Sequence, residues 1–175
     1  MSSANELIES LLLSYKEVIG GQFNAYRNHV YRVYLNCLLI DPTEANAGKY
    51  AVAAVFHDIG IWIKHSFDYI DPSIEQAEYY LTEEGACDWV EEIAAMIYWH
   101  HKTAKYKGNY QLTVETFRKA DWTDVSFGLF RFGLKPKQLK ENRRNYPGRG
   151  FHLFLLKGVS GHAFRHPFYP LPMFK

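Results

Sequence analysis

The sequence predicts a single all-α domain. Apolar residues recur at spacings of three and four through most of the chain, which is the period of an amphipathic helix. No alternating pattern typical of a strand extends over a useful length. The chain has 175 residues, the size of one ordinary domain. We therefore expect one domain over 1–175, with a motif-bearing core at about 25–130 and a basic helix and aromatic, proline-rich tail at about 133–175.

The first two expected helices have clear start and stop signals. A capping-box pattern that begins at Ser3 starts the first helix, and the pair Gly20-Gly21 ends it. The second helix runs over about 25–39. It ends before Pro42, because the residue that precedes a proline is disfavoured in the helical region.

The third and fourth helices begin at residues that favour the N-cap position. Thr43 caps a third helix that reaches Phe56. Asp71 is followed by proline, and an N-cap residue with proline at the first helical position predicts the start of the fourth helix. Gly85 ends this helix, because glycine favours the position after a helix C-terminus.

Two further helices follow. Asp88 and a glutamate three residues later cap a fifth helix that runs to about Lys102. A sixth helix begins at Leu112 or Thr113 and continues toward Phe132.

The C-terminal part is expected to be a short basic helix and an extended tail. Pro136 and Pro147 bracket the basic helix. The tail from Gly158 contains three prolines among aromatic residues and is expected to lie over the domain as an extended segment. These prolines are Pro167, Pro170 and Pro172. The basic run from Lys135 to Arg149 is typical of a solvated helix face, and a contact with a phosphorylated ligand or nucleic acid stays open.

Charge and hydropathy restrict the classes of partner. The chain has 20 Lys and Arg against 19 Asp and Glu, a formal net charge of +1, which makes nucleic acid an unlikely partner. The longest apolar stretch, 51–56, is far shorter than the roughly 20 residues that cross a bilayer. The N-terminus lacks the basic segment of a signal peptide, so we expect a cytoplasmic protein without a membrane partner. A homodimer stays open.

Ionisable residues on stripes that should be apolar are the chemical signal in this sequence. A buried ionisable group costs several kcal/mol unless it is paired or binds a metal. A lone histidine on such a stripe is usually a hydrogen-bonded core residue. Here four of the expected helices carry such residues on the buried face or at its end, and these are His29, His57-Asp58, His100-His101 and Asp121, with Asp124 one turn later. This pattern predicts a metal site between facing helices.

The residue types indicate which ions such a site would bind. Imidazole nitrogen and carboxylate oxygen in mixture favour first-row transition metals, and no cysteine pair with zinc-site spacing occurs. We expect one or two divalent ions from Mn, Fe, Co, Ni, Mg and Zn.

Three motifs carry a family resemblance. His29-x-x-Arg32, His57-Asp58-Ile-Gly and Ala-Asp121 resemble, in this order, the HD-domain superfamily of metal-dependent phosphohydrolases, over about 25–130. The resemblance implies that His29, His57, Asp58 and Asp121 are the metal ligands. It also implies hydrolysis of a small phosphate monoester or diester, with a nucleotide as the expected substrate, by metal-activated water. The phosphate-binding candidates are Arg32, Lys64, Lys102 and Lys119.

The chain departs from the family's pattern at two places. Ile61 stands where subgroups often have Lys or Glu, so a non-catalytic, metal-containing ligand-sensing or scaffold domain stays open as the alternative. The pair His100-His101 is followed by Lys102, without the HHE and GYP sequences of the cyclic-dinucleotide phosphodiesterases, which disfavours that substrate class.

His100 and His101 cannot have equal roles, because successive helical residues point about 100° apart. We hypothesise that at least one is a substrate ligand or proton donor and that neither coordinates the primary metal. If the pair brings a second ion, Asp58 is the natural bridge between the two metals.

Overall fold

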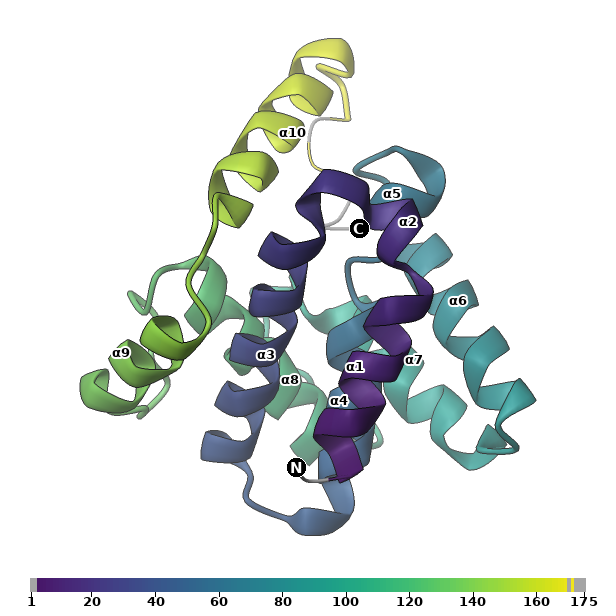
Figure 1. The fold of residues 1–175 in the computed structure, drawn as a ribbon, viewed down its shortest axis with the longest axis vertical. Helices are drawn as coiled ribbons and strands as arrows, with labels where there is room; N and C mark the ends of the chain where they lie inside the picture. The colour runs from purple at the N-terminus through teal and green to yellow at the C-terminus, as the bar shows by residue number, and fades with distance from the viewer. Residues whose placement is uncertain (1–2, 170, 172–175) are drawn as a thin grey trace.

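A computed structural model confirms the all-α fold class (Figure 1). It describes residues 3–169 and 171, and no β-strand occurs within this part of the chain. No helix in these segments is long and apolar enough to cross a membrane.

The first expected helix is interrupted. The N-terminal elements are α1 (Ser3–Ser14), α2 (Lys16–Ile19) and a 3-10 turn over Gly20–Gln22. The hydroxyl of Ser14 donates to the carbonyl of Leu11 over 2.7 Å, and such a local bond competes with helix continuation at Tyr15. Gly20 has a φ of +59°, a conformation that favours glycine, as its predicted stop role requires.

The next helices are α3 (Phe23–Ile40) and α4 (Glu44–Phe56). Asp41 follows α3 in an extended conformation before Pro42, and Thr43 occupies the N-cap of α4. Both boundaries lie within two residues of those predicted.

The central elements differ more from expectation. The structure adds a short helix, α5 (Gly60–Lys64), that the sequence pattern did not predict. Then α6 (Ile70–Glu83) has Tyr69, and not Asp71, at its N-cap. A proline in the first helical turn is tolerated because its missing N–H has no partner there, so the helix begins before the Asp-Pro pair.

The fifth and sixth helices are shorter than predicted. A 3-10 turn over Cys87–Trp89 contains Asp88, and α7 (Val90–Trp99) ends three residues before Lys102. Then α8 (Gln111–Val125) stops well before Phe132, because Phe127 and Gly128 both have positive φ and cannot continue a helix.

The C-terminal tail corrects one prediction. The basic helix, α9 (Pro136–Asn145), lies between the two prolines as expected, but α10 (Phe151–Arg165) is helical through Gly158, where an extended tail was expected. Isolated glycines are tolerated in helices at a cost of about 1 kcal/mol. Pro167 lies just beyond the helix end. Pro170 and Pro172 lie outside the described residues.

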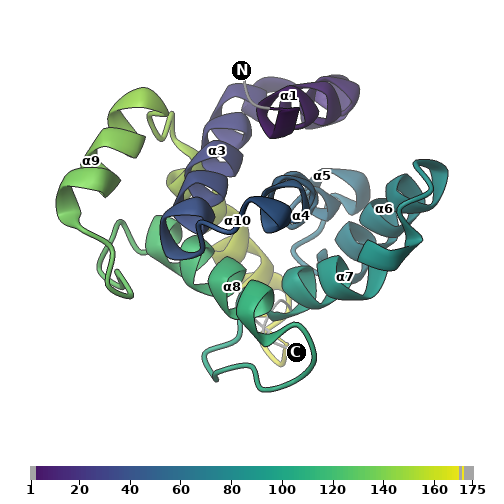
Figure 2. The same cartoon turned by 90° about the horizontal axis from the view of Figure 1, so that it is seen from below.

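The packing places α4 at the centre. Figure 2 shows α1, α3, α8, α7, α6 and α5 around it, with α9 set to one side. Direct contacts join α3 to α8, α7 to α8, and α4 to both α3 and α7. The helices that carry the predicted polar residues therefore pack against one another inside the domain.

Candidate metal centre

Four helices bring the predicted ligands to one buried point. His29 lies on α3, Asp121 on α8, His57 and Asp58 directly after α4, and His100 directly after α7. All five are at most 3% exposed. The Nε2 atoms of His29 and His57 lie 3.0 Å apart, and His29 Nε2 lies 3.5 Å from Asp121 Oδ1.

Three histidines of this cluster have a fixed orientation. His57 and His100 each donate from Nδ1 to the backbone carbonyl three residues earlier, over 2.8 and 2.5 Å. His29 donates from Nδ1 to the Asp124 carboxylate over 2.8 Å. Because carbonyl and carboxylate oxygens only accept, each Nδ1 carries a hydrogen, and in the neutral imidazole each Nε2 then has a lone pair that faces the cluster.

Several acceptor atoms in the cluster have no donor. His100 Nε2, Asp58 Oδ1 and both carboxylate oxygens of Asp121 are buried without a hydrogen-bond partner in the described part of the chain. Leaving such groups unsatisfied costs about 1 to 3 kcal/mol each. A cluster that contains acceptors and few donors fits a cation, and the mixture of imidazole and carboxylate fits a divalent metal.

The candidate ligands form two groups, and Asp58 of the second group also lies close to the first. One group comprises His29, His57 and Asp121, and the other comprises Asp58, His100 and His101; in each, the ligand atoms lie within 4.8 Å of one another. Asp58 faces both groups. Its Oδ2 lies 3.4 Å from His57 Nε2, and its Oδ1 lies 3.6 Å from His100 Nε2. This geometry suits a carboxylate that bridges two ions.

The ionisation of these groups is strongly perturbed. Burial raises the pKa of Asp121 to about 7, and the carboxylates of Asp58 and Asp124 add to this rise while His100 opposes it. Burial and the neighbouring imidazoles lower the pKa of His57 to about 3, against the attraction of Asp58. Perturbed groups of this kind are typical of functional sites.

Asp124 was noted in the sequence but not assigned a role. Besides His29, it accepts two hydrogen bonds from Arg32, from Nε over 2.7 Å and from Nη2 over 2.8 Å. Burial raises the pKa of Asp124, but the bonds from His29 and Arg32 outweigh it and hold this pKa well below its usual range. By accepting the hydrogen bond from His29, the Asp124 carboxylate orients the His29 ring, as a carboxylate behind a metal-bound histidine does in many metal sites. In the sequence, the position of Asp124 one turn after Asp121 was the signal that could have indicated this role.

The four predicted phosphate-binding candidates do not converge. The guanidinium of Arg32 is buried and bonded to Asp124 and to a backbone carbonyl. Lys64 is exposed at the end of α5. Lys119 Nζ lies 3.9 Å from Glu115, and Lys102 Nζ lies 4.7 Å from the ring centroid of Tyr98.

His101 lies at the edge of the cluster. Its Nδ1 lies 4.0 Å from Asp121 Oδ2, and its side chain is 17% exposed. The Nε2 atom of His101 shares a hydrogen bond of 2.5 Å with the hydroxyl of Tyr69. Both side chains line a cavity of about 180 Å³.

The N-terminal end of helix α10 covers the cluster at His29. The ring of Phe151 is fully buried and stacks on His29, with ring centroids 4.3 Å apart. The sequence analysis expected only the segment from Gly158 to lie over the domain and assigned no element at Phe151, so this contact was not predicted.

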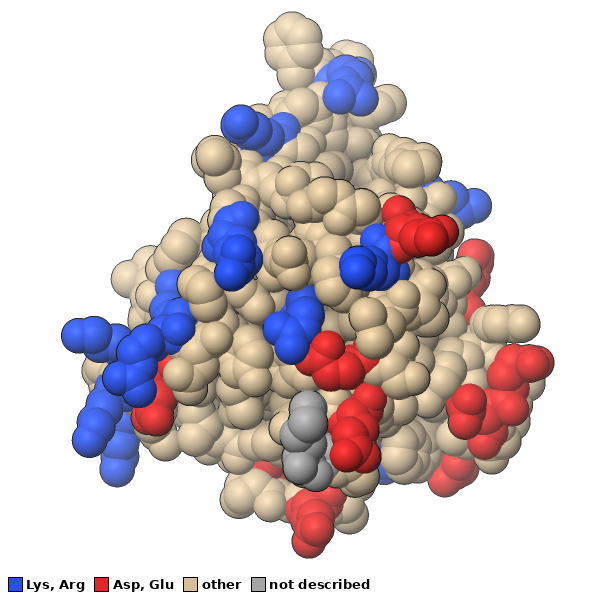
Figure 3. Space-filling model, viewed as in Figure 1, with Lys and Arg blue, Asp and Glu red and all other residues tan. Residues whose placement is uncertain are grey.

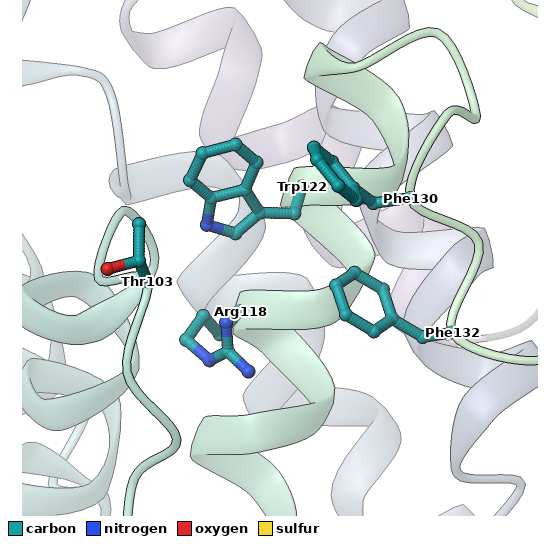
Figure 4. A pocket seen from close by; sticks show the side chains of 5 residues that line it. All are labelled: Thr103, Arg118, Trp122, Phe130 and Phe132. Atoms are coloured by element: carbon teal, nitrogen blue, oxygen red, sulfur yellow. The ribbon is translucent and has the colours of Figure 1, made fainter.

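A second pocket lies near the site, on α8. It has a volume of about 250 Å³ and is lined by Thr103, Arg118, Trp122, Phe130 and Phe132 (Figure 4). Trp122 also lines the cavity beside His101, so the two pockets share this side chain. Arg118 is bonded from Nε and Nη2 to Glu115.

Comparison with known proteins gives one match. A family model described as "HD domain" matches residues 26–126. No curated protein and no solved structure matches the chain.

Proposed function

Because the chain belongs to the HD-domain family, we propose that it is a metal-dependent phosphohydrolase that acts on a small phosphate ester, with a nucleotide as the expected substrate. The observation that carries this proposal is the buried cluster of imidazole and carboxylate acceptors without donors. Such a cluster has a chemical reason to exist when a divalent ion neutralises it.

The proposal assigns the ligands in two sets. His29, His57, Asp58 and Asp121 would hold the first ion, which is one of Mn, Fe, Co, Ni, Mg or Zn. His100 and Asp58 would hold a second. A bound divalent ion lowers the pKa of its water toward about 7 and neutralises charge that develops on the phosphoryl group.

The remaining side chains position this set and complete the site. Asp124 fixes the ring of His29, and Arg32 balances the charge of Asp124. His101, hydrogen-bonded to Tyr69 at the edge of the cluster, would contact the phosphoryl group as a neutral imidazole, because burial and the neighbouring His100 lower the pKa of His101 well below its usual range.

A non-catalytic scaffold is the second candidate. Ile61, at the position where HD-domain subgroups often carry Lys or Glu, is 4% exposed and offers no acid or base. In this alternative the metal stabilises the fold and no turnover occurs.

Metal analysis and an activity screen test the proposal. The purified protein is assayed for bound metal and offered phosphate monoesters and diesters with each candidate ion. The Asp121→Ala variant is the test and the exposed Asp88→Ala is its control. We expect turnover that falls at least a hundredfold in Asp121→Ala alone. Bound metal without turnover on any ester would support the scaffold, and a protein that binds no metal would overturn both candidates.

A further inference from the structure

Among the candidate ligands, His101 has the most exposed side chain. The side chains of His29, His57, His100 and Asp121 are at most 1% exposed and that of Asp58 is 4% exposed, whereas that of His101 is 17% exposed. A substrate whose phosphoryl group reaches the cluster therefore passes His101. Its organic group must then lie where His101 faces.

The cavity on that side is apolar. Besides Tyr69 and His101, aromatic and aliphatic side chains line it, and these are Phe67, Trp122, Val125, Leu155, Val159 and Leu171. No Lys, Arg, Asp or Glu is present among the described residues that line it. The candidate cations have other partners or positions, since Arg32 pairs with Asp124 and Lys119 lies near Glu115.

This lining selects against further charge on the substrate. A second phosphate placed there would lose its hydration without gaining a cation, which costs several kcal/mol. The cavity of about 180 Å³ has the size that holds one ring, because an apolar cavity of about 150 Å³ binds benzene. Phe67 and Trp122 offer ring faces for such a group.

The wall formed by α10 depends on close packing. A Cβ built on Gly158 would overlap the ring of Phe67, so the absence of a side chain at this position lets α10 approach the loop before α6. Leu155 and Val159, on either side of this contact in the sequence, then form one wall of the cavity.

We infer that the cavity beside His101 binds the leaving group, and that the substrate is a phosphate monoester whose alcohol carries one uncharged ring. The inference rests on the proposed function and narrows it. It favours a monoester with a single ring in the leaving group and disfavours di- and triphosphates.

The first test compares two alkyl esters of similar intrinsic reactivity, benzyl phosphate and glycerol 2-phosphate. We expect kcat/KM to be at least tenfold higher for benzyl phosphate, and tripolyphosphate to be a poor substrate. Turnover of both esters with equal kcat/KM would overturn the inference and leave the proposed function standing. If neither is hydrolysed, the proposed function is in question, and the inference is tested by binding alone.

The binding measurement uses non-hydrolysable probes. Benzylphosphonate and methylphosphonate are titrated into the metal-loaded protein by calorimetry. We expect the benzyl compound to bind at least tenfold more tightly. Equal affinities would contradict a ring site in the cavity.

Variants of the cavity wall test whether the substrate's ring binds in the cavity beside His101. Val159→Lys places a charge on the wall and should lower the benzyl-to-glycerol ratio at least tenfold, whereas Ser160→Lys, at the neighbouring exposed position, should leave it unchanged. The nearly isosteric Val159→Thr should lower the ratio several-fold and serves if the lysine variant does not fold.

Phe132→Ala, which alters the other pocket that Trp122 lines, should leave the ratio unchanged. A ratio that falls in Phe132→Ala but not in the Val159 variants would place the ring in that other pocket and overturn the inference.

Discussion

At the scale of single residues, the proton on Asp121 gives metal binding a defined pH dependence. Burial raises the pKa of Asp121 to about 7, so below this pH the carboxyl group is protonated and an entering cation must displace the proton. We expect the affinity for Mn²⁺ to fall about tenfold per pH unit below pH 7 and to level off above it. Calorimetric titrations from pH 5.5 to 8.5 measure this. An affinity independent of pH would contradict an Asp121 carboxyl group that must lose a proton before the metal binds.

Replacing Asp124 should show how far metal binding depends on the orientation of the His29 ring, because Asp124 is not itself proposed as a metal ligand. In Asp124→Asn, Arg32 stays buried without its counter-charge, and His29 keeps only a neutral acceptor. Breaking a buried ion pair costs about 3 to 5 kcal/mol, and losing the partner behind a ligand weakens metal binding about 10- to 100-fold.

Denaturant unfolding and metal titration of this variant measure the two effects. The exposed Asp88→Asn is the control and should change neither quantity. Unchanged metal affinity in Asp124→Asn would mean that His29 needs no partner for its orientation.

Helical periodicity predicted the buried positions of the polar residues. The structure brings His29, His57 and Asp121 together, with Asp58 3.7 Å from His29 and 3.4 Å from His57, whereas their role as ligands stays a prediction. The roles of Arg32 and Asp124 depend on how α3 and α8 are rotated against each other. That rotation is a tertiary property, which a single sequence does not contain.

At the scale of elements, the turn into α5 depends on Gly60. Its N–H donates to the Ser73 hydroxyl over 2.9 Å, and a Cβ there would overlap the carbonyl oxygen of Tyr69. Because backbone atoms cannot move aside cheaply, we expect Gly60→Ala to cost about 1 to 3 kcal/mol or more.

The matched control for this variant is Gly161→Ala in α10. A Cβ at Gly161 meets its nearest neighbour, Arg165, at 3.6 Å, an ordinary contact. Alanine is favoured over glycine inside a helix by about 0.5 to 1 kcal/mol, so this change should stabilise the protein. Thermal unfolding of both variants shows whether the signs differ as expected.

The boundaries of the helices were predictable where a proline determines them, as at the ends of α3 and α9. The boundaries were not predictable where the structure forms a helix that the local sequence does not indicate. The short α5 follows α4 through the turn at His57-Asp58, and α10 continues through two glycines because it packs on Phe67 and His29. Local composition does not reveal those contacts.

At the scale of the whole molecule, charge is unevenly distributed. Lys and Arg gather over α9 in Figure 3, whereas Asp and Glu gather over α6. The basic run is not uniformly solvated. Arg143 is 30% exposed at its side chain and donates to the carbonyl of Asp124. Part of this run therefore supports the site, which a solvated-face interpretation of Lys135 to Arg149 did not include.

Metal should contribute to global stability, because its ligands come from helices that are far apart in the sequence. At a thousandfold excess over Kd, a ligand that binds only the folded state stabilises it by about 4 kcal/mol, or about 10 °C in Tm for a chain of this size. We expect chelation to lower Tm by this order and Mn²⁺ to restore it. Asp121→Ala should show a much smaller response. Equal Tm values with and without metal would contradict a metal centre in the fold.

The hydrogen bonds behind the three histidines have a consequence for mutational tolerance. His57 and His100 donate to carbonyls of their own helices, three residues earlier, so no side-chain substitution can remove those acceptors. His29 alone relies on a side chain, that of Asp124. Variation in a population of such sequences is therefore constrained unequally. The backbone of their own helices fixes the tautomer of His57 and His100. The tautomer of His29 depends on Asp124, so His29 and Asp124 should be lost or retained together among related sequences.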